Sequence, residues 1–197
     1  LMLYLFKAFG LKNPDRNRFD ELLNNYFETL KRLDVGLNNE RDKQIVDEVT
    51  KNSWWKFALE ASKYRKTDYE KADAIFKEGL TAFPNSSMLL SNYAVFLSAN
   101  RKDYDEAEIY YKKALELDPT NAIINRIYAV FLSENRKDYD KAEIYYKKAL
   151  ELDPTNAGNI GSYAIFLKDC RKDYDKAEIY YKKSLEFDPT NAEVNNN

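Results

Sequence analysis

One segment of the chain occurs three times, and this repetition limits the fold more than any other feature of the sequence. The copies lie 35 residues apart and place Tyr104, Tyr139 and Tyr174 at the same position. Each copy reads RKDYD-x-AEIYYKK and ends in Asp-Pro-Thr-Asn-Ala. An eroded copy with Tyr69 and Pro84 in the matching places precedes them. Because self-similarity at a fixed period of roughly 20 to 50 residues is typical of solenoids and related arrays, the sequence predicts stacked units.

Each unit holds two helical patterns, one before the repeated segment and one within it. In the second pattern, Tyr104, Ala107 and Tyr111 follow at steps of three and four residues, which places them on one face of a helix. Asp103 is placed to cap the start of this helix, and Pro119 to end it. Helices of this length are marginal in water, so we expect their apolar faces to be buried between neighbouring hairpins.

The spacing of Tyr104, Ala107, Tyr111 and Pro119, with Ala94 in the preceding helix, resembles the tetratricopeptide repeat (TPR) family. The resemblance implies an all-α, right-handed superhelical solenoid of about four helix-turn-helix units, with an N-terminal helical cap. The predicted repeat domain covers residues 52–189, in units 52–84, 85–119, 120–154 and 155–189. Residues 190–197 are interpreted as the start of a truncated further unit or as a tail.

The turn between the two helices of a unit departs from the family pattern. The units are 35 residues long, whereas the family's usual length is about 34, and the extra residue falls in this turn, where the family usually has Gly. Asn100 and Asn135 are predicted to take the left-handed conformation that Gly would supply, whereas Cys170 is less suited to it. We therefore expect a longer turn and an unchanged fold.

The N-terminal region, residues 1–51, does not carry the repeat. Its first eleven residues are apolar but lack the charged start and cleavage site of a secretory signal. Apolar positions from Phe19 to Leu33 predict a helix, and those from Ile45 to Val49 a shorter one. These helices are predicted to cap the open end of the array. The alternative is that they belong to a neighbouring domain or bind a partner.

The residue inventory excludes several classes of site. The chain has no His and one Cys, which removes His-based metal sites, His-dependent triads and an intrachain disulfide. With 31 basic and 33 acidic residues, it lacks the basic excess that nucleic-acid binding requires. The carboxylates Asp103, Asp105 and Glu108 recur in every copy, so we interpret them as structural and not as acid-base machinery. We predict no enzymatic activity, no metal and no cofactor.

The location of the protein is suggested only by what the sequence lacks. No stretch approaches the about 20 apolar residues that span a bilayer, so a membrane is not the expected partner. The apolar residues 1–11 are interpreted as a helix buried against the next one, and the alternative is the tail of a membrane or partner-binding helix. One Cys and no export signal favour a cytoplasmic protein.

The first helices of the units differ most between copies, whereas the second helices are nearly identical. Neutral drift is one explanation of this difference, and specialisation for binding is the other. In the TPR family the first helices line the concave surface, so the resemblance implies that the variable residues face a groove. The predicted partner-binding residues are Met88, Ser91, Asn92, Val95, Ile123, Arg126, Ile127, Val130, Glu134, Ile165, Lys168 and Asp169.

The chemistry of these residues bears on the kind of partner. Some members of the family hold a peptide carboxylate with Lys, Asn and Arg along the groove. Asn92 matches such a position, whereas Ile127 and Ser162 stand where Asn or Arg would be expected. The groove therefore suits an apolar or amphipathic segment better than an acidic tail.

The sequence thus favours a non-catalytic scaffold that binds a protein or peptide partner. One alternative is the regulatory or sensing part of a larger enzyme or effector protein whose catalytic domain lies outside this segment. Another is a homo-oligomer built by stacking the nearly identical exposed units of separate chains.

Overall fold

A computed structural model describes residues 54–189, and every regular element in that range is helical. The chain divides into two compact units, Leu1–Asn52 and Ser53–Asn197. The predicted N-terminal cap and the predicted tail at 190–197 lie outside the described residues. The described α-helices are α4 (Trp55–Tyr64), α5 (Tyr69–Ala82), α6 (Ser87–Phe96), α7 (Tyr104–Leu117), α8 (Ala122–Phe131), α9 (Tyr139–Leu152), α10 (Ala157–Phe166) and α11 (Tyr174–Phe187).

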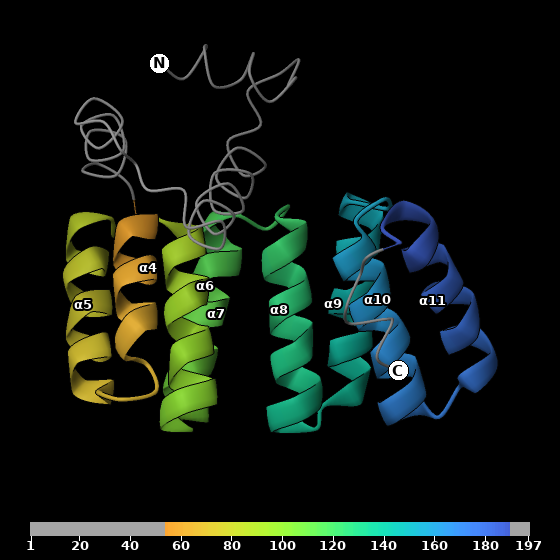
Figure 1. Ribbon diagram of the computed structural model, residues 1–197, viewed down its shortest axis with the longest axis horizontal. Coiled ribbons are helices and arrows are strands. Elements are labelled where there is room, and N and C mark those ends of the chain that lie inside the picture. The colour runs from red at the N-terminus through yellow and green to blue at the C-terminus, as the bar shows by residue number, and fades with distance from the viewer. Residues whose placement is uncertain (1–53, 190–197) are drawn as a thin grey trace, which may run out of the picture. The chain divides into compact units, whose positions relative to one another are not determined.

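These helices form hairpins that stand side by side, from α4 and α5 at one end of the row to α10 and α11 at the other (Figure 1). We call α4, α6, α8 and α10 the first helices and α5, α7, α9 and α11 the second helices. The contacts of each hairpin are made with the hairpins beside it. This arrangement is the all-α solenoid that the repeat predicts.

The helix starts follow from short polar side chains that satisfy free backbone N–H groups. The carboxylate of Asp103 accepts a hydrogen bond from the N–H of Glu106 at 3.1 Å, as the sequence predicts. Asp68, Asp138 and Asp173 cap the other second helices in the same way. The first helices α6, α8 and α10 are capped by the side chains of Ser86, Asn121 and Asn156.

The turn between first and second helix takes up the extra residue by widening, not by placing Asn in the left-handed region. Each first helix from α6 onward continues into a five-residue π-helical turn, Leu97–Arg101, Leu132–Arg136 or Leu167–Arg171. The residue after it has a positive φ: 56° at Lys102, 58° at Lys137 and 58° at Lys172.

The prediction for Asn100 and Asn135 is therefore wrong, because these residues lie inside the π-helical turn. The Asn100 side chain instead donates from Nδ2 to the carbonyl of Arg65 in the preceding unit, at 3.0 Å. The reversal falls two residues later, where the N–H of Lys102 bonds the carbonyl of Leu97.

Small buried residues let the helices approach closely. Ala94, Ala129 and Ala164 occupy the same position in successive first helices, and each is fully buried. The second helices also carry a small residue at one shared position. It is Gly79 in α5 and Ala or Ser in the other second helices. A Cβ added to Gly79 would lie 2.6 Å from the Cβ of Phe57, so the pairing of α4 with α5 excludes even Ala there.

The two sets of helices are not equally close along the row. Neighbouring first helices pack on one another, α4 on α6, α6 on α8 and α8 on α10, whereas neighbouring second helices lie less closely together. The side on which helices are closer is the inner side of a curved stack. The first helices therefore form the inner wall of the described array, and the second helices form its outer side.

Candidate functional site

The structure places most of the predicted partner-binding residues on the inner wall with part of their surface open. Glu134 and Asp169 are exposed. The half-exposed members of the set are Met88, Asn92, Val95, Ile123, Arg126, Ile127, Val130, Ile165 and Lys168. The side chains of Val95, Ile127 and Val130 also pack on the main core, and this packing holds them in place.

Ser91 is an exception to this placement. Its side chain is fully buried, and its hydroxyl donates to the carbonyl of Met88 at 3.0 Å. A side chain with no open surface cannot contact a partner, so the prediction that Ser91 binds one is wrong. The equivalent residue of the next unit is Arg126, which is long enough to reach out of the same packed position.

Some polar side chains of the inner wall form hydrogen bonds to other groups of the same wall. Asn92 donates from Nδ2 to the carbonyl of Met88 at 2.8 Å, within its own helix. Arg126 extends along the row and donates from Nη1 to the hydroxyl of Ser162 at 3.5 Å. Its Nε is buried and has no hydrogen-bond partner among the described residues. The wall therefore joins aliphatic side chains to the Arg126 guanidinium, whose Nε is buried and not open to a partner.

Sequence reasoning missed a set of arginines that bridge successive units. Arg136, at the end of a first helix, donates from Nε to Glu108 at 2.8 Å and from Nη2 to Asp105 at 2.6 Å. Arg171 repeats the arrangement with Glu143 and Asp140, at 2.8 and 2.7 Å. Two carboxylates of the recurring cluster, in each of the first two copies, are thus occupied in holding successive units together.

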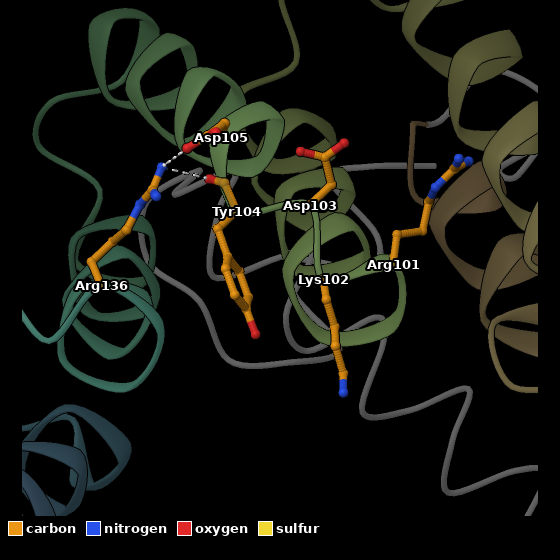
Figure 2. Close-up of a pocket in the computed structure, with 6 residues that line it drawn as sticks. All are labelled: Arg101, Lys102, Asp103, Tyr104, Asp105 and Arg136. Carbon is orange, nitrogen blue, oxygen red and sulfur yellow. Dashed lines mark hydrogen bonds and ion pairs between the residues drawn. The ribbon is translucent and has the colours of Figure 1, made fainter.

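A hollow of about 350 Å³ lies beside one of these bridges. Figure 2 shows its lining, with Arg136 reaching toward Asp105 on one side and Arg101 turned away on the other. The Arg101 guanidinium lies 3.3 Å from a carboxylate oxygen of Asp73. Because both guanidiniums already face carboxylates, neither is free to bind an anion in the hollow.

The charges at the bridges shift the acidity of the groups that form them. Burial alone would raise the pKa of the Glu108 carboxyl, but Lys112 and Arg136 outweigh it and hold this pKa below its usual value. At Glu143 the hydrogen bond from Lys147 is the main cause of a lowered pKa, and Arg171 adds to it. Both carboxylates are therefore ionised near neutral pH, as an ion pair requires.

Residues 54–189 offer little that could carry chemistry. Burial raises the pKa of the Cys170 thiol, which keeps it protonated and poorly nucleophilic near neutral pH. No group of three or more side chains in this range could hold a metal ion. Among the helices of this range, none combines the length and apolar character that crossing a membrane requires.

Two family models match the repeats. One, described as tetratricopeptide repeat, matches residues 96–121 and 131–156, and a second of the same description matches residues 171–191. No curated protein matches the chain in sequence.

Solved structures of similar fold include PilW and PilF. The chain is similar to PilW, titled a widely conserved type IV pilus biogenesis factor, with 26% identity and a TM-score of 0.63. It is also similar to PilF of Pseudomonas aeruginosa, with 22% identity and a TM-score of 0.62. The similarity covers 72% and 74% of this chain but only 64% and 65% of those chains, less than two thirds of their length.

A third similar structure contains a bound peptide. It is the first TPR domain of Spaghetti (RPAP3), bound to the HSP90 peptide SRMEEVD. The identity is 22% and the TM-score 0.50, with 56% of this chain and 86% of that chain covered. At this identity the likeness concerns the fold alone.

Proposed function

Since the repeats of this chain belong to the tetratricopeptide repeat family, we propose that it is a non-catalytic scaffold whose inner wall holds a peptide or helix of a partner protein. Protein interaction is the general role that the family supports. The groove, its residues and its preference for one kind of segment are the specific part of the proposal.

The observation that carries the proposal is a half-exposed aliphatic side chain at the same position of three neighbouring first helices. Val95 on α6, Val130 on α8 and Ile165 on α10 occupy the same position of successive units, 35 residues apart. Each is half-buried and still offers apolar surface, and Val95 and Val130 are held in place by packing on the main core. A row of this kind fits the apolar face of an amphipathic segment laid along the wall.

The polar residues of the wall favour such a segment over an acidic tail. The RPAP3 domain, of similar fold, binds the acidic peptide SRMEEVD. In this chain the three positions that would face a peptide carboxylate hold Asn92, Ile127 and Ser162. The Asn92 amide is bonded within its own helix, Ile127 has no donor, and Ser162 is buried. Arg126 is the cation placed to pair with an acidic group at the edge of the bound segment.

The test is a selection of binding peptides followed by substitution of the wall. Peptides enriched from a random display library on the immobilised chain are measured against Val130→Asp/Arg126→Glu. The matched control is Ile144→Asp/Lys113→Glu, which makes the same chemical changes on second helices, where Ile144 is 62% exposed. We expect the wall variant to lose binding at least about tenfold, since it buries a charge against an apolar ligand.

The control variant should bind like the parent chain. Circular dichroism must show that both variants keep their helical content. If the peptides bind both variants and the parent chain equally, the inner wall is not their binding site.

A further inference from the structure

The inner wall presents one aliphatic side chain per unit, and the interval between these side chains limits what can lie along it. Val95, Val130 and Ile165 stand at the same position of successive first helices and are half-exposed. Because α6, α8 and α10 pack on one another, their axes are about 8–10 Å apart. A segment that contacts all three side chains must therefore present an apolar side chain at the same interval.

Among regular backbone conformations, the α-helix fits this interval best. Seven residues of helix advance about 10.5 Å and complete nearly two turns, so every seventh residue lies on one face. In an extended strand three residues advance about 10 Å, but residues i and i+3 point to opposite faces. A polyproline II segment returns to the same side about every 9 Å. The grooves that recognise it are lined by aromatic side chains, whereas the row on this wall is aliphatic.

Acidic side chains follow the aliphatic row at a distance of four residues in two of the units. Glu134 follows Val130 and Asp169 follows Ile165, and both acidic residues are exposed. Among residues 54–189, no Lys or Arg lies within ion-pair distance of Glu134. Asp169 lies 3.9 Å from the ammonium of Lys168, its neighbour in the chain, and exposed pairs of this kind contribute little. One flank of the aliphatic row therefore offers carboxylates to a bound segment.

We infer that the segment held by the inner wall is a basic amphipathic α-helix of a partner protein. It carries aliphatic residues at every seventh position, and Lys or Arg at the same spacing on the flank that faces Glu134 and Asp169. The inference rests on the proposed function and names the conformation and charge of the segment.

The remaining parts of this chain match that pattern poorly. In residues 1–53 and 190–197, no two Lys or Arg residues stand seven apart in the sequence. The pairs that do so within the described range belong to helices that are already packed in the array, and they are Lys56 with Lys63, Lys141 with Lys148, and Lys176 with Lys183. A partner protein is therefore the better source of the helix.

The probe is a synthetic helix of three heptads with Leu at i, i+7 and i+14 and Lys at the same spacing on one flank. A fluorophore and a side-chain staple, placed away from the Leu row, report binding and keep the peptide helical. A control peptide of the same composition has Leu at i, i+5 and i+10, which do not share a face. Fluorescence anisotropy measures the affinity of the full chain for both peptides.

The chain variants reverse two charges on the wall or two elsewhere. The wall variant is Glu134→Lys/Asp169→Lys. Its matched control is Glu151→Lys/Glu186→Lys, also 35 residues apart and exposed, on second helices. The parent chain and the control variant should bind the probe equally, and the wall variant should bind it about tenfold more weakly because two attractions become repulsions. A probe with Glu in place of Lys should reverse that order. Circular dichroism checks that both variants keep their helical content.

No binding of the probe to the parent chain, equal binding of the control peptide, or equal binding to the wall variant would overturn the inference. The proposed function would survive each of these results if peptides selected from a random library still lose binding to Val130→Asp/Arg126→Glu. Concentration-dependent self-association that Glu134→Lys/Asp169→Lys abolishes would also overturn the inference, because the occupant would then be a second copy of this chain.

Discussion

The carboxylates of Glu108 and Glu143 make the array sensitive to acid. Each binds an arginine of the next unit, and each has a pKa below its usual value. A group whose pKa is lowered by folding stabilises the folded state above its unfolded pKa, which is about 4.3 for Glu. That stabilisation is lost as the pH falls through the lower, folded pKa.

Glu108→Gln combined with Glu143→Gln should therefore cost about 1–2 kcal/mol of unfolding free energy at pH 7. The cost should shrink as the pH falls below about 4, because the parent carboxylates are then protonated too. Urea unfolding at several pH values measures both stabilities. The control is Glu116→Gln with Glu151→Gln, also 35 residues apart but exposed. A difference between parent and variant that does not change with pH would contradict the assigned charge pairs.

Predictions for single residues succeeded where the residue and the group it contacts lie within one helical turn of each other. Asp103 caps the segment that begins at Tyr104, and the two residues adjoin in the chain. The arginine bridge of Arg136 could not be predicted in this way. Its partners lie 28 and 31 residues earlier, in the preceding unit. Which side chains of successive units face each other depends on the rotation between hairpins, and a repeat length does not determine that rotation.

At the scale of the element, the turn was predicted to be longer but its conformation was not. Asn is the residue that most often replaces Gly at positive φ, and that preference pointed to Asn100 and Asn135. The π-helical turn uses up the extra residue before the chain reverses, and the reversal then falls on Lys102 and Lys137. Local preference was overridden by the register that the second helix requires, because Asp103 and Asp138 must remain at its N-terminus.

The conformation of the turn predicts opposite effects of Gly at Lys137 and at Asn135. Lys137→Gly should stabilise the chain by about 0.5–1 kcal/mol, because φ of 58° strains a side chain with a Cβ and suits Gly. Asn135→Gly should destabilise it by about 0.5–1 kcal/mol, since Gly weakens a helical position. Thermal unfolding of the two variants measures the difference. Stabilisation by Asn135→Gly and not by Lys137→Gly would place the left-handed residue where the sequence first suggested.

On the scale of the whole described array, hairpins pack only on their neighbours. The surroundings of a residue therefore depend on the place of its unit in the row as much as on the residue type. The sequence predicted the solenoid and the inner wall because both follow from the repeat and from a resemblance. The difference between interior and end faces could not be read from it, since α9 and α11 are nearly the same helix. What separates them is the presence of α10 against α9.

The same substitution should therefore have different effects at Tyr139 and Tyr174. Tyr139 is half-buried with its ring 6.5 Å from that of Phe166, whereas Tyr174 is 62% exposed. Tyr139→Ala should cost about 2 kcal/mol, because it removes aromatic packing between two units. Tyr174→Ala should change stability by less than about 0.5 kcal/mol. Urea unfolding of each variant beside the parent chain measures both costs. Equal losses would mean that Tyr174 is packed as well as its interior equivalent Tyr139, against the difference in exposure of the two side chains.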